Sequence, residues 1–177
     1  MVNKRTAIFC VLNSTNKKII SCQIIHKYSD VYRDEFTFVE NNSNGGFGGI
    51  LGYFSNQFNI GFLTTGQDWY LVRFIIQDDY GSTYLIESNP INFRGIIDNL
   101  EKVIAFDQII ERNENGFVRG SLLFNIESTS GFKKHVLRES DSRYGNFIEL
   151  HENEIVFKSS SGTSRTGTIK KQLYLPR

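Results

Sequence analysis

The chain has 177 residues, a formal net charge of +1, 40% hydrophobic residues and 14% aromatic residues. This length suits one domain, and 15 Phe and 8 Tyr supply material for a packed core, which excludes a disordered chain. The near-zero charge excludes a partner selected by bulk electrostatics alone. Two cysteines, Cys10 and Cys22, are too few for a disulfide scaffold, so we expect buried free thiols or one optional bridge.

The beginning of the chain lacks the pattern of a targeting segment. The apolar run at 7–12 is too short for a signal-peptide core or a membrane span. We therefore expect a soluble protein made in the cytoplasm, with release by lysis or export by a non-classical route as the alternative.

The first half of the chain is rich in β-prone segments separated by turn residues. Residues 35–40 alternate between apolar and polar with period two, as a half-buried strand does. A glycine-rich loop is expected at 41–49. The expected strands are 6–12, 19–28, 35–40, 50–55 and 58–63.

The only tryptophan follows a turn at 64–68 and begins a strand at 69–77. Asp68, Trp69 and Tyr70 form the structural motif of this segment, and we expect the Trp69 ring in the core between two sheets. An acidic turn at 78–81 and a strand at 82–87 complete a hairpin.

The pattern then changes to helical spacing. Apolar residues at 93, 96, 97, 100, 103 and 104, after a possible N-cap at Asn92, predict an amphipathic helix at about 93–105. Further strands are expected at 117–127, 132–138, 146–150, 154–159 and 172–175, with a loop at 159–167. Many short strands with one helix predict a single domain, 1–177, that folds as an all-β, two-sheet β-sandwich.

No arrangement of residues predicts catalysis. The glycine run 45–49 lacks the Gly-Lys-Ser/Thr of a phosphate loop and is better explained as a surface loop. Asp78 and Asp79 lack EF-hand spacing, although a weak calcium site is the alternative to a solvated turn. The histidines are scattered, and a triad of His26, Asp30 and a serine lacks a Gly-x-Ser-x-Gly motif. We expect no enzymatic activity, no cofactor and no metal site.

The residues that could bind a ligand are aromatic and basic. Aromatic side chains with a polar tip suit membrane interfaces and sugar stacking, although sheet packing explains them as well. The basic C-terminal region could bind phosphate groups or protect a sheet edge from aggregation. The candidate ligand-binding residues are Tyr28, Tyr32, Phe47, Tyr80, Lys170 and Lys171.

Five segments of the chain form a recognisable set in collinear order. The segments are His26-Lys27-Tyr28-Ser29-Asp30, Thr65-Gly66-Gln67-Asp68-Trp69-Tyr70-Leu71-Val72, Ser88-Asn89-Pro90-Ile91-Asn92-Phe93-Arg94, Gly131-Phe132-Lys133-Lys134-His135-Val136-Leu137-Arg138-Glu139 and Lys158-Ser159-Ser160-Ser161-Gly162-Thr163-Ser164. Together they resemble the "up-regulated in Daf" domain family of nematodes and fungi. The resemblance implies a small β-sandwich and supplies no catalytic residues; at the level of fold it extends to actinoporins, aegerolysins and fungal fruit-body lectins. The short polar stretch 112–116 departs from the apolar insert of fungal relatives.

These observations favour a non-enzymatic recognition or toxin-like protein. It would bind a membrane lipid headgroup or a surface glycan, and it could oligomerise on membranes and permeabilise them. The alternative is a stress-response domain that binds a protein partner and has no lytic activity. No RNA-recognition or helix-turn-helix pattern is present, so nucleic acid is not an expected partner.

Overall fold

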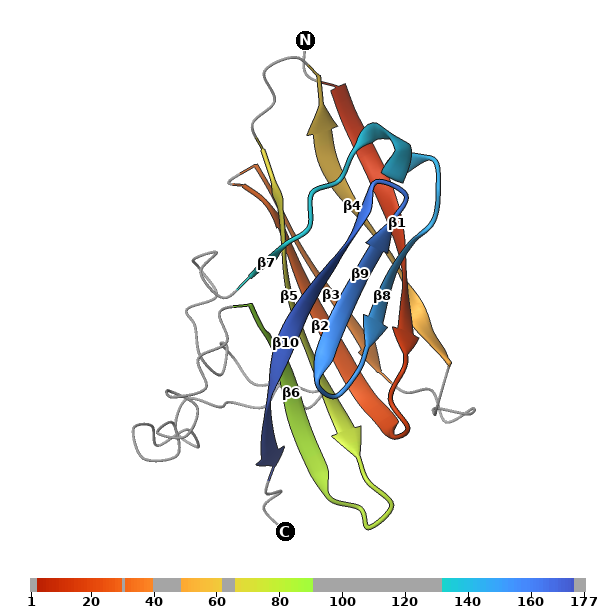
Figure 1. Ribbon diagram of the computed structural model, residues 1–177, viewed down its shortest axis with the longest axis vertical. Coiled ribbons are helices and arrows are strands. Elements are labelled where there is room, and N and C mark those ends of the chain that lie inside the picture. Colours follow the sequence, from red (N-terminus) through yellow and green to blue (C-terminus); the bar gives the residue numbers. More distant parts are fainter. Residues whose placement is uncertain (1–2, 30, 40–48, 62–65, 91–131, 174–177) are drawn as a thin grey trace, which may run out of the picture.

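The computed structural model describes residues 3–29, 31–39, 49–61, 66–90 and 132–173. Within them the chain forms ten strands and one short 3-10 helix (Figure 1). The elements are β1 (Asn3–Asn13), β2 (Lys18–Tyr28), β3 (Tyr32–Val39), β4 (Ile50–Ile60), β5 (Asp68–Gln77), β6 (Thr83–Asn89), β7 (Lys133–Lys134), η1 (Glu139–Ser142), β8 (Asn146–Leu150), β9 (Glu154–Ser159) and β10 (Gly162–Leu173).

The strands form one continuous sheet in the order β3-β2-β5-β6-β10-β9-β8-β1-β4, with β7 paired to β5. Every pair is antiparallel except β1 with β8. The all-β class is confirmed. The two-sheet sandwich is wrong, because this single sheet curves until it is nearly closed and barrel-like. The helix expected at 93–105 lies outside the described residues.

The two edge strands, β3 and β4, meet through side chains rather than through backbone pairing. Phe36 of β3 stacks on Phe54 of β4, with ring centroids 4.6 Å apart. Tyr32 donates a hydrogen bond to Asn59 Oδ1 at 3.0 Å near the upper end in Figure 1. These contacts close the seam between β3 and β4 and leave aromatic packing, not a ladder, to hold the edges together.

Alternation along β1 separates the interior from the outer face, whereas β2 and β5 are buried at nearly every position. On β1, Ala7, Phe9 and Val11 are fully buried, whereas Ile8 on the opposite face is 59% exposed. Full burial of a side chain as large as Val11 or Phe9 contributes about 1.5–3 kcal/mol. The interior also contains Tyr70 of β5, which donates a hydrogen bond at 2.9 Å to Asn56 Oδ1 of β4, a strand that is not its neighbour in the sheet.

The strand pattern predicted from the sequence is largely confirmed, with informative exceptions. Strands 146–150 and 154–159 are confirmed at both ends, and the turn at 78–81 joins β5 to β6. The two strands expected at 50–55 and 58–63 are one strand within the described residues, β4, which ends at Ile60; positions 62 and 63 lie outside the described residues. The loop expected at 159–167 is wrong, since β10 begins at Gly162, and 132–138 contains only the two-residue β7. The expected strand 117–127 lies outside the described residues, as does all of the expected loop 41–49 except Gly49, which precedes β4.

The expectation for Trp69 is also wrong. Trp69 is half-buried on the outer face of β5, where it packs against a small cluster of Ile25, Leu71 and Phe132. Its neighbour Tyr70 takes the interior position, because successive side chains of a strand point to opposite faces. The two cysteines are both free and buried, as one of the two alternatives predicts.

Candidate functional site

The chemistry-bearing residues of the described chain gather in two places, a buried cluster in the upper half of the sheet and a groove at the lower end. In the buried cluster, His26 Nε2 lies 2.8 Å from Asp68 Oδ1, and both side chains are at most 1% exposed. Asp68 Oδ2 also accepts the backbone N–H of Leu137 at 3.3 Å. Burial raises the pKa of Asp68, while its hydrogen bond to His26 and the charge of His26 oppose that rise.

His135 is the second histidine of the buried cluster. Its Nδ1 lies 2.8 Å from Ser164 Oγ and its Nε2 lies 2.8 Å from Ser159 Oγ, so the two strands of the β9–β10 hairpin hold the ring between them. Burial lowers the pKa of His135 to about 4, which keeps the imidazole neutral near neutral pH. No carboxylate orients this ring, so the arrangement differs from a Ser-His-Asp triad.

Asp141 of η1 holds the tip of the same hairpin. Its carboxylate accepts hydrogen bonds from Ser160 Oγ at 3.0 Å, from Ser161 Oγ at 2.5 Å and from the Ser161 backbone at 3.0 Å. Burial raises the pKa of Asp141, but these hydrogen bonds and one from the Arg138 backbone outweigh it and place the pKa below its usual value. The carboxylate is fully buried. The cluster therefore joins η1 to the β9–β10 hairpin.

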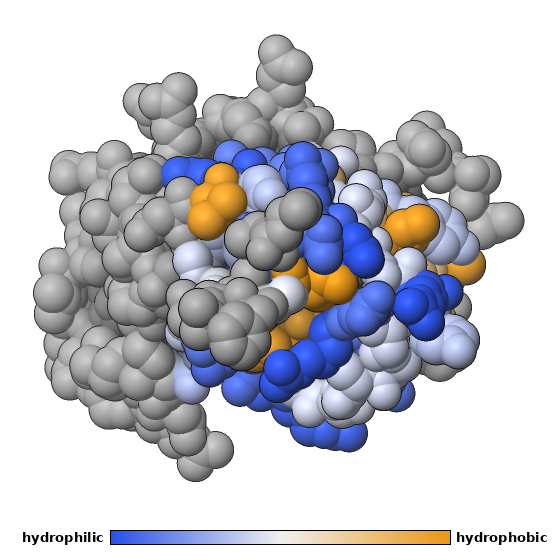
Figure 2. Space-filling model, turned by 90° about the horizontal axis from the view of Figure 1, so that it is seen from above, coloured by the Kyte–Doolittle hydropathy of each residue, from blue (hydrophilic) through white to orange (hydrophobic). Residues whose placement is uncertain are grey.

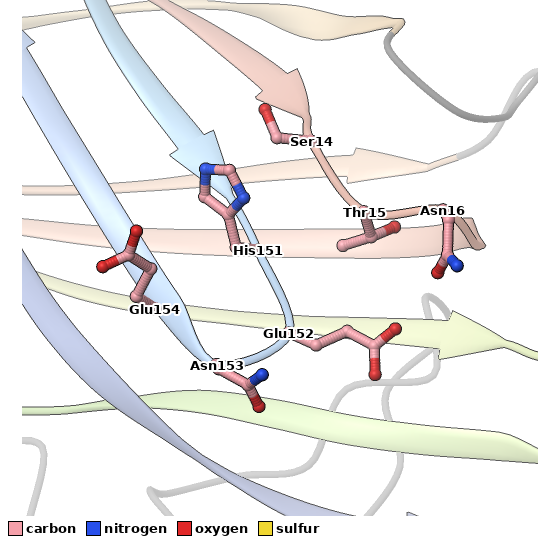
Figure 3. A pocket seen from close by; sticks show the side chains of 7 residues that line it. All are labelled: Ser14, Thr15, Asn16, His151, Glu152, Asn153 and Glu154. Carbon is pink, nitrogen blue, oxygen red and sulfur yellow. The ribbon is translucent and has the colours of Figure 1, made fainter.

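The groove lies where two turns meet at the lower end of the sheet (Figures 1 and 3). One turn joins β1 to β2, the other joins β8 to β9, and the backbone N–H of Ser14 donates to Leu150 O at 2.9 Å to dock them. The groove has a volume of about 580 Å³ and every lining residue is polar. The lining residues are Ser14, Thr15, Asn16, His151, Glu152, Asn153 and Glu154.

The β1–β2 turn is held rigid by its own side chains. Asn13 Oδ1 accepts hydrogen bonds from the Thr15 backbone at 2.9 Å and from Thr15 Oγ1 at 2.7 Å. Asn13 Nδ2 donates to the carbonyl oxygen of Lys17 at 2.9 Å, and Thr15 Oγ1 accepts the backbone N–H of Lys17 at 3.1 Å. Such side-chain to backbone bonds fix a turn in one conformation, so this wall of the groove is preformed.

Charged side chains beside the groove form a small group around Glu152. Glu152, which extends toward the β1–β2 turn in Figure 3, contacts Lys17 Nζ at 3.1 Å and Lys170 Nζ at 3.3 Å. Burial raises the pKa of Glu152, but the hydrogen bonds and charges of both lysines outweigh burial, so the pKa lies below its usual value. Lys170 Nζ also lies 4.4 Å from the centre of the Tyr84 ring, a cation–π contact.

The ligand candidates taken from the sequence divide between the two ends of the sheet. Tyr28 is 3% exposed at the end of β2, and Tyr32 begins β3, so both stand at the upper end near the seam. Tyr80 is 94% exposed on the β5–β6 turn, at the lower end. Lys170 borders the groove and Lys171 follows it on β10. Phe47 lies outside the described residues.

The upper end carries a different surface. Figure 2 shows hydrophobic side chains near the centre of the visible face, bordered by hydrophilic ones.

The described part of the chain contains no group of three or more His, Cys, Asp and Glu side chains placed to hold a metal ion. Within the same residues, no helix is long and apolar enough to cross a membrane.

Reasoning from the sequence missed most of the groove. Its lining residues belong to turns separated by about 135 positions, as the contact between Lys17 and Glu152 shows. Each of the two segments looks like an ordinary polar turn and has no motif that would link it to the other. The segments are Asn13-Ser14-Thr15-Asn16 and His151-Glu152-Asn153. The motif segments at 26, 68, 135 and 159–164, in contrast, do come together, in the buried cluster.

Comparison with known proteins agrees with the resemblance of those motif segments. A search of curated proteins finds no match for the chain. The sequence model of one family, described as "Up-Regulated in long-lived daf-2", matches residues 3–168, which is nearly the whole chain. The protein therefore belongs to the "Up-Regulated in long-lived daf-2" family.

Proposed function

We propose that this protein is a recognition module without catalytic activity, and that it binds a surface glycan in the groove between the β1–β2 and β8–β9 turns. The observation that carries the proposal is the groove itself, a concave site lined by seven polar side chains. Hydroxyl-rich ligands need neighbouring donors and acceptors, which Asn16, Asn153, Glu152 and His151 supply.

Two further features support a ligand at this end. The Asn13 network fixes the β1–β2 turn in advance, so less conformational entropy is lost when a ligand binds. Tyr80, on the next turn of the same end, is 94% exposed, and an exposed tyrosine can stack on a sugar ring while its hydroxyl stays hydrated. Lys18 pairs with Gln77 in the β2–β5 ladder, so the β1–β2 turn before Lys18 lies beside the β5–β6 turn after Gln77.

A glycan array with the full chain tests this function. We expect binding that the double variant Asn16→Ala/Asn153→Ala weakens by about fivefold or more, since each lost hydrogen bond costs about 1 kcal/mol. Arg143→Ala, at an exposed residue after η1, is the matched control and should bind like the wild type. Binding to liposomes without glycans, or array binding that both variants retain, would contradict the groove as the site.

A second candidate function, a protein-interaction domain, is favoured by the outer face of β4, β1 and β8. Tyr53 and Phe147 stand on either side of Cys10 in register, and Ile8 lies on the same face. These three large side chains are 63%, 41% and 59% exposed. Clustered apolar side chains on one face mark protein interfaces, and the Lys158–Glu149 ion pair at 2.7 Å provides a charged rim.

The partner that suits this face is a protein with an apolar centre and charges of both signs around it. A photo-crosslinking amino acid at Tyr53 would capture that partner, and the complex would then be rebuilt from purified proteins. We expect Phe147→Ser to weaken the purified complex by about tenfold or more, as truncation of a central aromatic residue does. Failure to form a complex from purified components would reject this second function.

A further inference from the structure

We propose that the groove selects acidic glycans, with the carboxylate or sulfate group of the sugar bound between Lys17 and Lys170. This inference rests on the proposed function and adds the chemical class of the ligand. Lys17 belongs to the β1–β2 turn and Lys170 to β10, so two separate elements direct ammonium groups to one border of the groove.

The first observation is an excess of positive charge at that border. Lys17 and Lys170 share a single carboxylate, Glu152, so the three charges sum to +1. All three side chains are partly exposed, at 27%, 37% and 24% for Lys17, Lys170 and Glu152, so a ligand can reach them. Each ammonium carries three N–H donors, more than one shared carboxylate uses.

The second observation is that the other carboxylates around the groove are already matched by cations. Glu154 accepts a hydrogen bond from Arg165 at 2.9 Å, and Glu149 contacts Lys158 at 2.7 Å. These two acids therefore repel an incoming anion less than unpaired carboxylates would. Of these three ion-pair groups among the described residues, only the Lys17–Glu152–Lys170 group has charges that do not sum to zero.

The third observation is that Lys170 is positioned before any ligand binds. Its ammonium rests over the Tyr84 ring at 4.4 Å while also contacting Glu152. A lysine held on two sides loses less side-chain entropy on binding than a freely rotating one. The neutral side-chain amides of Asn16 and Asn153 remain to bind the sugar hydroxyls. Binding of the acidic group of the ligand by the two lysines therefore adds to hydroxyl recognition and does not replace it.

The experiment compares pairs of oligosaccharides that differ only in one acidic group, with carboxylated and sulfated members measured separately by calorimetry. We expect the acidic member to bind about tenfold more tightly than its neutral counterpart at low salt, since hydrogen bonds to charged groups are the stronger ones. The difference should shrink as salt rises, because partly exposed charges are screened.

Three variants assign the effect to these residues. Lys17→Met and Lys170→Met should each reduce the preference for the acidic member and retain binding to the neutral one. Glu152→Gln, which keeps the shape of the side chain, should strengthen binding of the acidic member by removing its competitor. Lys134→Met, at an exposed position on β7, controls for general charge and should change nothing.

The outcomes separate this inference from the proposed function. Equal binding of neutral and acidic members, lost in Asn16→Ala/Asn153→Ala, would overturn the acidic preference and leave glycan recognition standing. An acidic preference that survives both lysine variants, or weaker acidic binding by Glu152→Gln, would overturn the assignment to Lys17 and Lys170. Absence of binding to every member would overturn both proposals.

Discussion

The ring of Phe38 lies against the backbone of Gly52 across the seam, so a Cβ at position 52 would stand 2.5 Å from Phe38 Cδ1. Glycine at 52 lets the edge strands β3 and β4 approach closely. We expect Gly52→Ala to lower the free energy of unfolding by about 1–3 kcal/mol, as overpacking does. Urea unfolding measures this value. Gly162→Ala is the control, because a Cβ there meets nothing within 4 Å; equal stability of the two variants would contradict a tightly packed seam.

Acid should destabilise the protein through His135. Its pKa is about 4 in the folded protein against an ordinary 6.5, so the unfolded chain binds more protons between these values. The contribution of neutral His135 to the free energy of unfolding is fully present above about pH 6.5 and is lost as the pH falls toward 4. The free energy of unfolding should fall by about 3 kcal/mol over this range.

Urea unfolding across this pH range checks the expectation. His135→Gln should flatten the dependence of the unfolding free energy on pH, whereas His151→Gln, a change in the half-exposed histidine at the groove, should preserve it. A wild-type protein whose stability is constant from about pH 6.5 to 4 would show that His135 does not titrate as its burial requires.

The buried His26–Asp68 pair predicts a strong effect of removing one partner. Asp68→Ala leaves His26 and the Leu137 backbone N–H without their acceptor, and we expect a loss of about 3–5 kcal/mol. The double variant His26→Leu/Asp68→Leu should recover part of this loss, because the buried imidazole is then no longer stranded and only the Leu137 backbone N–H still lacks its acceptor. Thermal and urea unfolding measure both variants. Asp79→Ala, on the exposed β5–β6 turn, should stay within about 0.5 kcal/mol of the wild type.

The fluorescence of the only tryptophan reports on the outer cluster. Phe132 is 2% exposed and packs with Trp69, Ile25 and Leu71, and the Lys27 ammonium lies 4.8 Å from the centre of its ring. Phe132→Ala should expose Trp69 to water and shift its emission to longer wavelength, with a loss of about 3–5 kcal/mol. Phe147→Ala, on the other outer face, should leave the emission unchanged. An unshifted spectrum in Phe132→Ala would place Trp69 away from this cluster.

Much of the candidate site could not be predicted from the sequence, for a physical reason. Tyr80 was recognised because its turn is local, and Asp78 closes that turn by accepting the backbone N–H groups of Tyr80 and Ser82. Glu152 has no local signal at all. Its role depends on Lys17 and Lys170, which reach it from a distant turn and from β10. Contacts over such separations leave no periodicity in either segment.

The sequence by itself determined the local structure: the β5–β6 hairpin from its alternation and acidic turn, β8 and β9 from short apolar segments between turn residues, and membership of the family from the order of its motifs. Only the tertiary structure decided that the strands form one sheet instead of two, that β1 pairs in parallel with β8, and that the Tyr70 side chain, not that of Trp69, lies in the core. The alternation of side chains defines two faces of a strand, but which face is interior depends on how the whole sheet curves. That curvature brings Phe36, Phe38 and Phe54 into contact at the seam, which joins strands that are not neighbours in the ladder.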